Sequence, residues 1–66
     1  MTPPARLQAE VAALIKSSGE DGAEKAATTL GLTAETVCRI ALGQDVRPVS
    51  INIATDRLAR RAAKAR

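Results

Sequence analysis

The chain has 66 residues, enough for one small domain, with a net charge of +3, a pI near 9.8, one cysteine, no histidine and no aromatic residue. This composition excludes an internal disulfide and a Cys/His metal cluster, and no catalytic constellation or Gly-rich phosphate loop is present, so we expect neither an enzyme nor a cofactor or metal. No apolar run is long enough to span a bilayer and no signal peptide follows Met1, so we expect no membrane contact.

The first predicted helix covers residues 3–17. It begins at Thr2-Pro3-Pro4, where a threonine N-cap precedes prolines of the first turn, which need no N–H donor. Its apolar residues recur at helical spacing and form one stripe that faces a core: Leu7, Val11, Leu14 and Ile15.

Residues 23–43, AEKAATTLGLTAETVCRIALG, predict two helices joined by a tight turn at Gly31. Glycine adopts a positive φ without steric cost, so one helix can end there and another can begin within a few residues. The helix before the turn opens with Asp21 and Glu24 at capping-box spacing and ends at Leu30.

The helix after the turn has Thr33 as its N-cap and ends at Gly43. Two helices this close in sequence must meet at a steep angle. The small Ala27 would let their backbones approach, while Val37 and Ile40 would close the inner corner. Cys38 lies in the same helix, where we expect a small half-buried residue and not a redox sensor.

Residues 44–49 form a connector held by Pro48, and a fourth helix covers residues 50–64. One stripe of this helix should pack against the first and third helices: Ile51, Ala54, Leu58 and Ala62. The opposite stripe is polar apart from its first member: Ile53, Arg57, Arg60 and Lys64. No segment predicts a pairable strand, and we expect no second domain, so the predicted fold class is all-α with four helices.

Positive charge is concentrated in the second half of the chain. Residues 1–33 carry three Lys or Arg against four Asp or Glu, a net charge of −1, whereas residues 34–66 carry seven against three, a net charge of +4. This asymmetry indicates a polyanionic partner. The cations near the C-terminus also solvate the last helix and favour its dipole: Arg57, Arg60, Arg61, Lys64 and Arg66.

Residues 26–43, with the pattern AAxxLGLTxxTVxRIxxG, resemble the helix-turn-helix of the lambda-repressor/Cro-type DNA-binding family. The likeness rests on the residues at the family's structural spacings and continues to Arg47-Pro48: Ala27, Gly31, Leu32, Val37, Ile40 and Gly43. It implies a small four-helix lambda-repressor-like bundle, residues 1–66, that binds double-stranded DNA. It also implies a cytoplasmic, nucleoid-associated Cro-like repressor that is controlled by its own concentration and needs no small-molecule effector.

The resemblance places the helix over residues 33–43 in the major groove. Ala34, Glu35 and Arg39 would then lie nearest the base edges. Arg39 would donate to guanine O6 and N7, Glu35 would accept from cytosine N4, and Ala34 would contact a thymine methyl group. Two plainer roles stay open, with Glu35 as a carboxylate that favours the helix dipole and Arg39 as a solvated charge.

Three further residues are expected at phosphates, namely Thr33, Thr36 and Arg47, and Cys38 lies on the outward face beside them. One departure from the family concerns the start of the second helix, which is acidic: Glu20, Asp21 and Glu24. Either these side chains point away from the DNA, or the helix docks through its backbone N–H groups, or the protein sits differently on the duplex.

Four aliphatic residues fall near the third helix without a place in the predicted core: Leu42, Val46, Val49 and Ile53. Related proteins form part of their two-fold contact here, so we expect a weak homodimer on a DNA site with two inverted half-sites. The rival interpretation is that Val46 and Val49 cap the small core.

Two other functions were weighed against duplex binding. Single-stranded nucleic acid is disfavoured because no aromatic ring is available for base stacking. The stronger alternative is a small helical protein-interaction module, such as a phage- or plasmid-type regulator that binds a host protein through its acidic N-terminal half.

Overall fold

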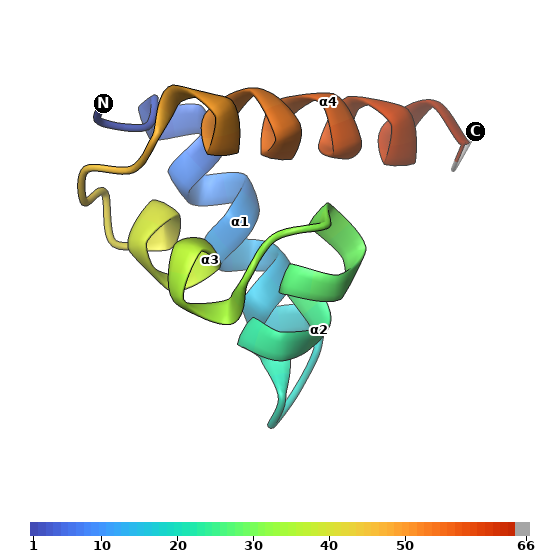
Figure 1. Cartoon of the computed structure of the whole chain (residues 1–66). Helices are drawn as coiled ribbons and strands as arrows, with labels where there is room; N and C mark the ends of the chain where they lie inside the picture. Colours follow the sequence, from blue (N-terminus) through green and yellow to red (C-terminus); the bar gives the residue numbers. More distant parts are fainter. Residues whose placement is uncertain (65–66) are drawn as a thin grey trace.

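The computed structural model describes residues 1–64, which form four helices and no strand. The helices are α1 (Ala5–Ser17), α2 (Gly22–Leu30), α3 (Ala34–Ala41) and α4 (Pro48–Lys64) (Figure 1). The predicted all-α fold with four helices is therefore confirmed. Within this described part, none of the helices combines the length and the apolar character that crossing a membrane requires.

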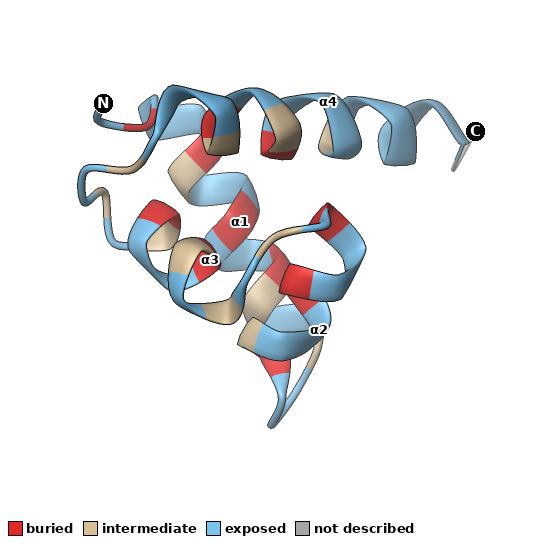
Figure 2. Ribbon diagram, viewed as in Figure 1, coloured by how far each residue is buried: buried red, intermediate tan, exposed pale blue. Residues whose placement is uncertain are grey.

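The core is aliphatic and is shared by all four helices. Helices α1, α2 and α3 pack on one another, and their buried residues lie on the sides that face inward (Figure 2). The buried apolar residues are Leu7, Val11, Leu14, Ala26, Ala27, Leu30, Val37, Ile40, Ile51 and Ala54. Burial of each large aliphatic side chain stabilises the fold by about 1.5–3 kcal/mol, so this set supplies most of the driving force.

The predicted stripe of α1 is confirmed, but its predicted start is wrong. Leu7, Val11 and Leu14 are buried, and α1 begins at Ala5 with Pro4 in the N-cap position and no capping side chain. The hydroxyl of Thr2 instead donates to Asp45 Oδ1 at 3.2 Å. The two prolines keep the chain extended past Thr2, which is therefore too far from the first turn to cap it.

Helix α2 begins where the sequence predicts, without the predicted capping box. Asp21 occupies the N-cap position, and its side chain makes no capping hydrogen bond. Its backbone carbonyl accepts from Lys25 N at 2.9 Å, which is the first helical hydrogen bond. Gly22, the next residue, is buried against α1, where a Cβ would collide with the Ile15 carbonyl.

Helix α4 differs from its prediction in start and in packing. It begins at Pro48, two residues before the predicted Ser50, because proline suits the first turn of a helix, where its missing N–H has no role. It packs chiefly on α2 and only weakly on α1 and α3, which corrects the expected contacts. Ile51 and Ala54 are buried as predicted, Leu58 is half-buried and Ala62 is exposed.

Candidate nucleic-acid interface

The turn between α2 and α3 is built by backbone hydrogen bonds at Gly31. This residue has φ +70°, and its N–H donates to Thr28 O while Leu32 N donates to Ala27 O at 2.9 Å. These two bonds satisfy the last carbonyls of α2, as in a Schellman motif, which favours glycine at the left-handed position. The chain can therefore leave α2 and enter α3 after three residues, as the sequence predicts.

Helix α3 is held at its start by the predicted cap. Thr33 Oγ1 accepts from Thr36 N at 3.2 Å and lies 2.8 Å from the Thr36 hydroxyl. At the other end, Gly43 has φ +75° and donates to Ile40 O, while Gln44 N donates to Arg39 O. Both ends of α3 are thus fixed by local hydrogen bonds, which gives the side chains between them a defined direction.

One face of α3 is anchored and the other is free. Val37 and Ile40 are completely buried between the helices, whereas Glu35, Cys38 and Arg39 are exposed (Figure 2). The exposure of Cys38 corrects the expected half-burial, because the residue follows Val37 directly and so turns outward when Val37 enters the core. The thiol is free.

Two other candidate contact residues of α3 are less accessible than Glu35 and Arg39. Ala34 is half-buried and packs against the core, which limits the surface that it can offer to a thymine methyl group. Thr36 is also half-buried, and its hydroxyl is engaged by Thr33. The accessible polar groups of α3 are therefore chiefly Glu35 and Arg39.

Glu35 and Arg39 form an ion pair with each other. Arg39 Nη2 lies 2.8 Å from Glu35 Oε1, and the two side chains are 51% and 74% exposed, respectively. The residues are one helical turn apart, with the acid N-terminal to the base, which is the favoured order on a helix. The two groups expected to contact separate bases are therefore bound to each other in the free protein.

Arg47 is exposed in the connector between α3 and α4. The connector is held by the N-terminal segment, since Val46 N donates to Met1 O at 3.0 Å and the Met1 amino group donates to Val46 O at 2.9 Å. The same amino group lies 3.3 Å from Asp45 Oδ1. Arg47 is thus a cation on a tethered loop that follows α3.

Sequence reasoning named Arg57 among the cations of the last helix but did not place it beside the turn. Arg57 Nη2 lies 3.9 Å from the position that a Cβ on Gly31 would occupy, so this side chain reaches from α4 to the turn between α2 and α3. The expected polar stripe contains Ile53, one turn earlier, which is half-buried. The presence of Ile53 in that stripe was the available signal in the sequence, because an isoleucine among arginines indicates that this side of α4 also faces the protein.

The remaining charges lie on the surface. The acidic residues at the start of α2 are exposed, and so are the described cations of α4: Glu20, Asp21, Glu24, Arg57, Arg60, Arg61 and Lys64. Arg60 pairs with Asp56 at 3.2 Å. Arg66, which the sequence groups with these cations, lies outside the described residues.

The four residues expected in a dimer contact divide into two groups. Leu42 and Val49 are exposed, at 71% and 56%, and are therefore available to a partner. Val46 packs against the core, so the rival interpretation holds for this residue but is wrong for Val49, and Ile53 is half-buried. The hydrogen bonds between Met1 and Val46 explain the inward position of the latter.

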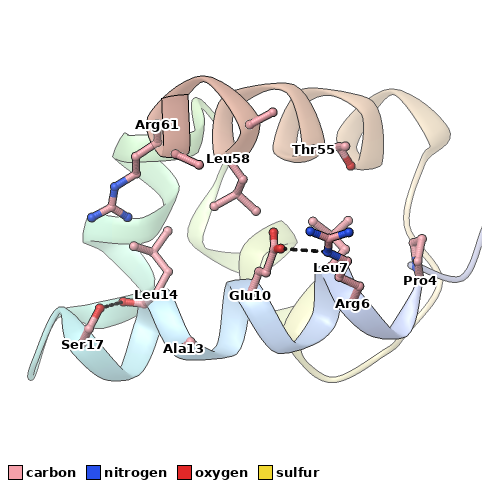
Figure 3. Close-up of a pocket in the computed structure, with 12 residues that line it drawn as sticks. Pro4, Arg6, Leu7, Glu10, Ala13, Leu14, Ser17, Thr55, Leu58 and Arg61 are labelled. Atoms are coloured by element: carbon pink, nitrogen blue, oxygen red, sulfur yellow. Dashed lines mark hydrogen bonds and ion pairs between the residues drawn. The ribbon is translucent and has the colours of Figure 1, made fainter. Parts of the chain in front are cut away.

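An apolar groove of about 820 Å³ separates α1 from α4. Figure 3 shows Leu14 of α1 and Leu58 of α4 pointing toward each other across it. Arg61 lies at the α4 side, and an ion pair between Arg6 and Glu10, at 3.3 Å, lies at the α1 side. The groove lies between these two helices because α4 packs chiefly on α2 and makes few contacts with α1.

Comparisons of this chain with protein-family models, with curated proteins and with solved structures gave no match.

Proposed function

We propose that the protein is a sequence-specific regulator that binds double-stranded DNA with the exposed face of α3. The observation that carries this proposal is the division of α3, a capped helix in which Val37 and Ile40 are fully buried while Glu35 and Arg39 are exposed. A helix held in this way can enter a major groove without losing its own packing. The resemblance of residues 26–43 to a helix-turn-helix supports the same conclusion.

Charge around α3 supports a duplex as the partner. Arg47 follows α3 in the connector, and Arg57 reaches the turn that precedes it. Cations on both sides of a groove-binding helix would neutralise phosphates, and the release of counterions would favour binding. The exposed carboxylates at the start of α2 would be repelled by phosphates, so we propose that α3 and its flanking cations approach the DNA more closely than α2 does.

The proposed regulator acts as a Cro-like repressor on an inverted-repeat operator. Two copies would occupy half-sites about one helical turn, ~34 Å, apart. Leu42 and Val49 are the exposed aliphatic residues nearest the end of α3 in sequence, and they would form the centre of a weak two-fold contact. Val46 and Ile53, which are half-buried, would pack beneath these two exposed side chains.

The proposal is tested by selecting duplexes from a random library with the full chain and measuring their affinity over a range of salt concentrations. We expect a preferred sequence, and affinity that falls steeply with salt because several phosphates are neutralised. Arg39→Ala should reduce affinity for the preferred duplex by about tenfold or more and affinity for random duplexes much less. Lack of any duplex binding would refute the proposal.

A second candidate function, binding of a partner protein, is favoured by the groove between α1 and α4. A partner helix with aliphatic side chains on one face and carboxylates beside them would fit the leucine lining and Arg61. In that case Leu58→Gln should abolish partner capture and Arg39→Ala should not. Under the DNA-binding proposal, Leu58→Gln leaves the affinity of the folded protein for the preferred duplex unchanged. Because Leu58 also packs against the core, circular dichroism of the variant must show that it is folded.

A further inference from the structure

The ion pair on the outer face of α3 bears on how the proposed regulator distinguishes base pairs. We propose that Glu35 does not contact a base itself but positions Arg39 for one guanine. This inference rests on the proposed function and deepens it, because it assigns different roles to the two polar side chains at the centre of the interface.

Arg39 has enough N–H donors to bind Glu35 and a guanine at the same time. A guanidinium group has five N–H donors in a fixed plane. The contact at 2.8 Å occupies one N–H of Nη2, at one edge of the planar group. The remaining donors can still form the two parallel bonds to O6 and N7 of guanine.

The same geometry disfavours direct contact between Glu35 and cytosine. A free carboxylate close to the duplex is repelled by the phosphates. The pair that Glu35 forms with Arg39 has no net charge, so this repulsion is absent while the pair is intact. Releasing Arg39 to reach a cytosine would therefore leave Glu35 unneutralised in a strongly negative environment. Keeping the pair intact avoids this repulsion.

The pair also restricts the rotation of Arg39. An exposed ion pair on a helix stabilises the fold only slightly, so its main effect here lies in binding. A long arginine side chain loses rotamer freedom when it binds, and a partner that already limits that freedom lowers the cost. Glu35 thus increases the preference of Arg39 for guanine without adding a contact of its own.

The test is a double-mutant cycle on the selected duplex. Glu35→Ala, Arg39→Ala and the double variant are each measured on the preferred duplex and on duplexes with one base pair changed at a time. Removal of Glu35 also removes a negative charge, which favours binding to every duplex alike, so the informative quantity is the ratio of affinities between duplexes. Circular dichroism of each variant confirms that the helices remain.

We expect Glu35→Ala to reduce discrimination at the same base pair as Arg39→Ala, by several-fold to about tenfold. In the Arg39→Ala background, the further loss of Glu35 should leave the ratio unchanged, because no side chain remains to be positioned. Glu35→Gln should keep part of the discrimination, since its amide oxygen can still accept from Arg39.

The matched control is the pair between Asp56 and Arg60 on α4, which has the same spacing and a similar distance of 3.2 Å. Asp56→Ala removes the same charge and should leave every ratio unchanged. The inference is overturned if Glu35→Ala relaxes a different base pair from Arg39→Ala with additive effects, which would make Glu35 a direct base contact. Absence of any preferred duplex would refute the proposed function itself, and this inference with it.

Discussion

Thr33 is the residue that fixes the start of α3. Its hydroxyl accepts from the Thr36 amide and pairs with the Thr36 hydroxyl, so it satisfies one of the free donors in the first turn. Ala34, which follows it, is half-buried, and Glu35 comes next and is exposed. The direction of Glu35 and Arg39 therefore depends on a cap at a position that the sequence identifies without the structure.

Thr33→Ala should lower the free energy of unfolding by about 1 kcal/mol, because the capping acceptor is lost and nothing replaces it. The measurement is urea unfolding followed by circular dichroism. Thr29→Ala is the matched control, since Thr29 is an exposed threonine inside α2 whose hydroxyl donates to the Lys25 carbonyl. The Thr29→Ala substitution should leave the free energy of unfolding nearly unchanged. Equal effects from the two substitutions would show that Thr33 does not act as a cap.

Arg47→Ala should weaken binding to the preferred duplex and to random duplexes by the same factor. The reason is that Arg47 lies outside α3 and is proposed to contact a phosphate, which carries no sequence information. The slope of log affinity against log salt should fall by about one. Arg6→Ala removes the same charge from the groove side of α1 and should leave the slope unchanged. An unchanged slope for Arg47→Ala would remove this residue from the interface.

At the scale of the elements, the backbones of α1 and α2 approach each other closely at Gly22. Gly22 is buried at the first position of α2, and a Cβ there would collide with the Ile15 carbonyl. Backbone atoms cannot move aside as a flexible side chain can, so α2 sits at a distance from α1 that only glycine permits. The position of α2, and through it that of α3, depends on this contact.

Gly22→Ala should therefore lower the free energy of unfolding by about 1–3 kcal/mol, through overpacking. The control is Gly19→Ala, because Gly19 has φ +83° and open space around its Cα. That substitution costs only the strain of a left-handed conformation, roughly 1 kcal/mol. Thermal and urea unfolding of both variants provide the comparison. If Gly22→Ala lowers the free energy of unfolding less than Gly19→Ala does, α2 does not need a glycine at this contact.

Helical periodicity was sufficient to predict the buried faces of α1 and α3 but not that of α4, where Ala62 is exposed and Ile53 is half-buried. The stripes of α1 and α3 are short-range patterns, and every large member of them is buried or half-buried. Periodicity does not specify which helix a stripe will contact, and so the packing of α4 on α2 was not predicted. The consequences of that packing, the position of Arg57 beside Gly31 and the groove between α1 and α4, were missed for the same reason.

Sequence patterns also predict the candidate site only in part. The outward direction of Glu35 and Arg39 follows from the burial of Val37 and Ile40, which the sequence predicts. Their pairing depends on rotamers, and a spacing of four residues permits it without requiring it. Likewise, the hydrogen bonds between Met1 and Val46 join residues far apart in sequence, and no local pattern indicates them.

At the scale of the whole molecule, the proposed homodimer depends on few exposed aliphatic residues. Leu42→Gln combined with Val49→Gln should leave the fold and the affinity for a single half-site intact, because both side chains are already exposed. The substitutions keep the net charge, so the phosphate interaction does not change. Cooperative occupation of two inverted half-sites should be lost, as judged from gel-shift titrations. Persistent cooperativity would place the interface elsewhere.

The central claim is that the exposed face of α3 is the surface that meets DNA. The most direct measurement is the change in backbone amide NMR shifts of the full chain when the preferred duplex is added. The largest changes are expected over residues 33–39 and 44–47, with little change at Ala13 and Ala62, which line the groove between α1 and α4. Changes concentrated at Ala13, Leu58 and Ala62, with residues 33–39 unaffected, would contradict the account.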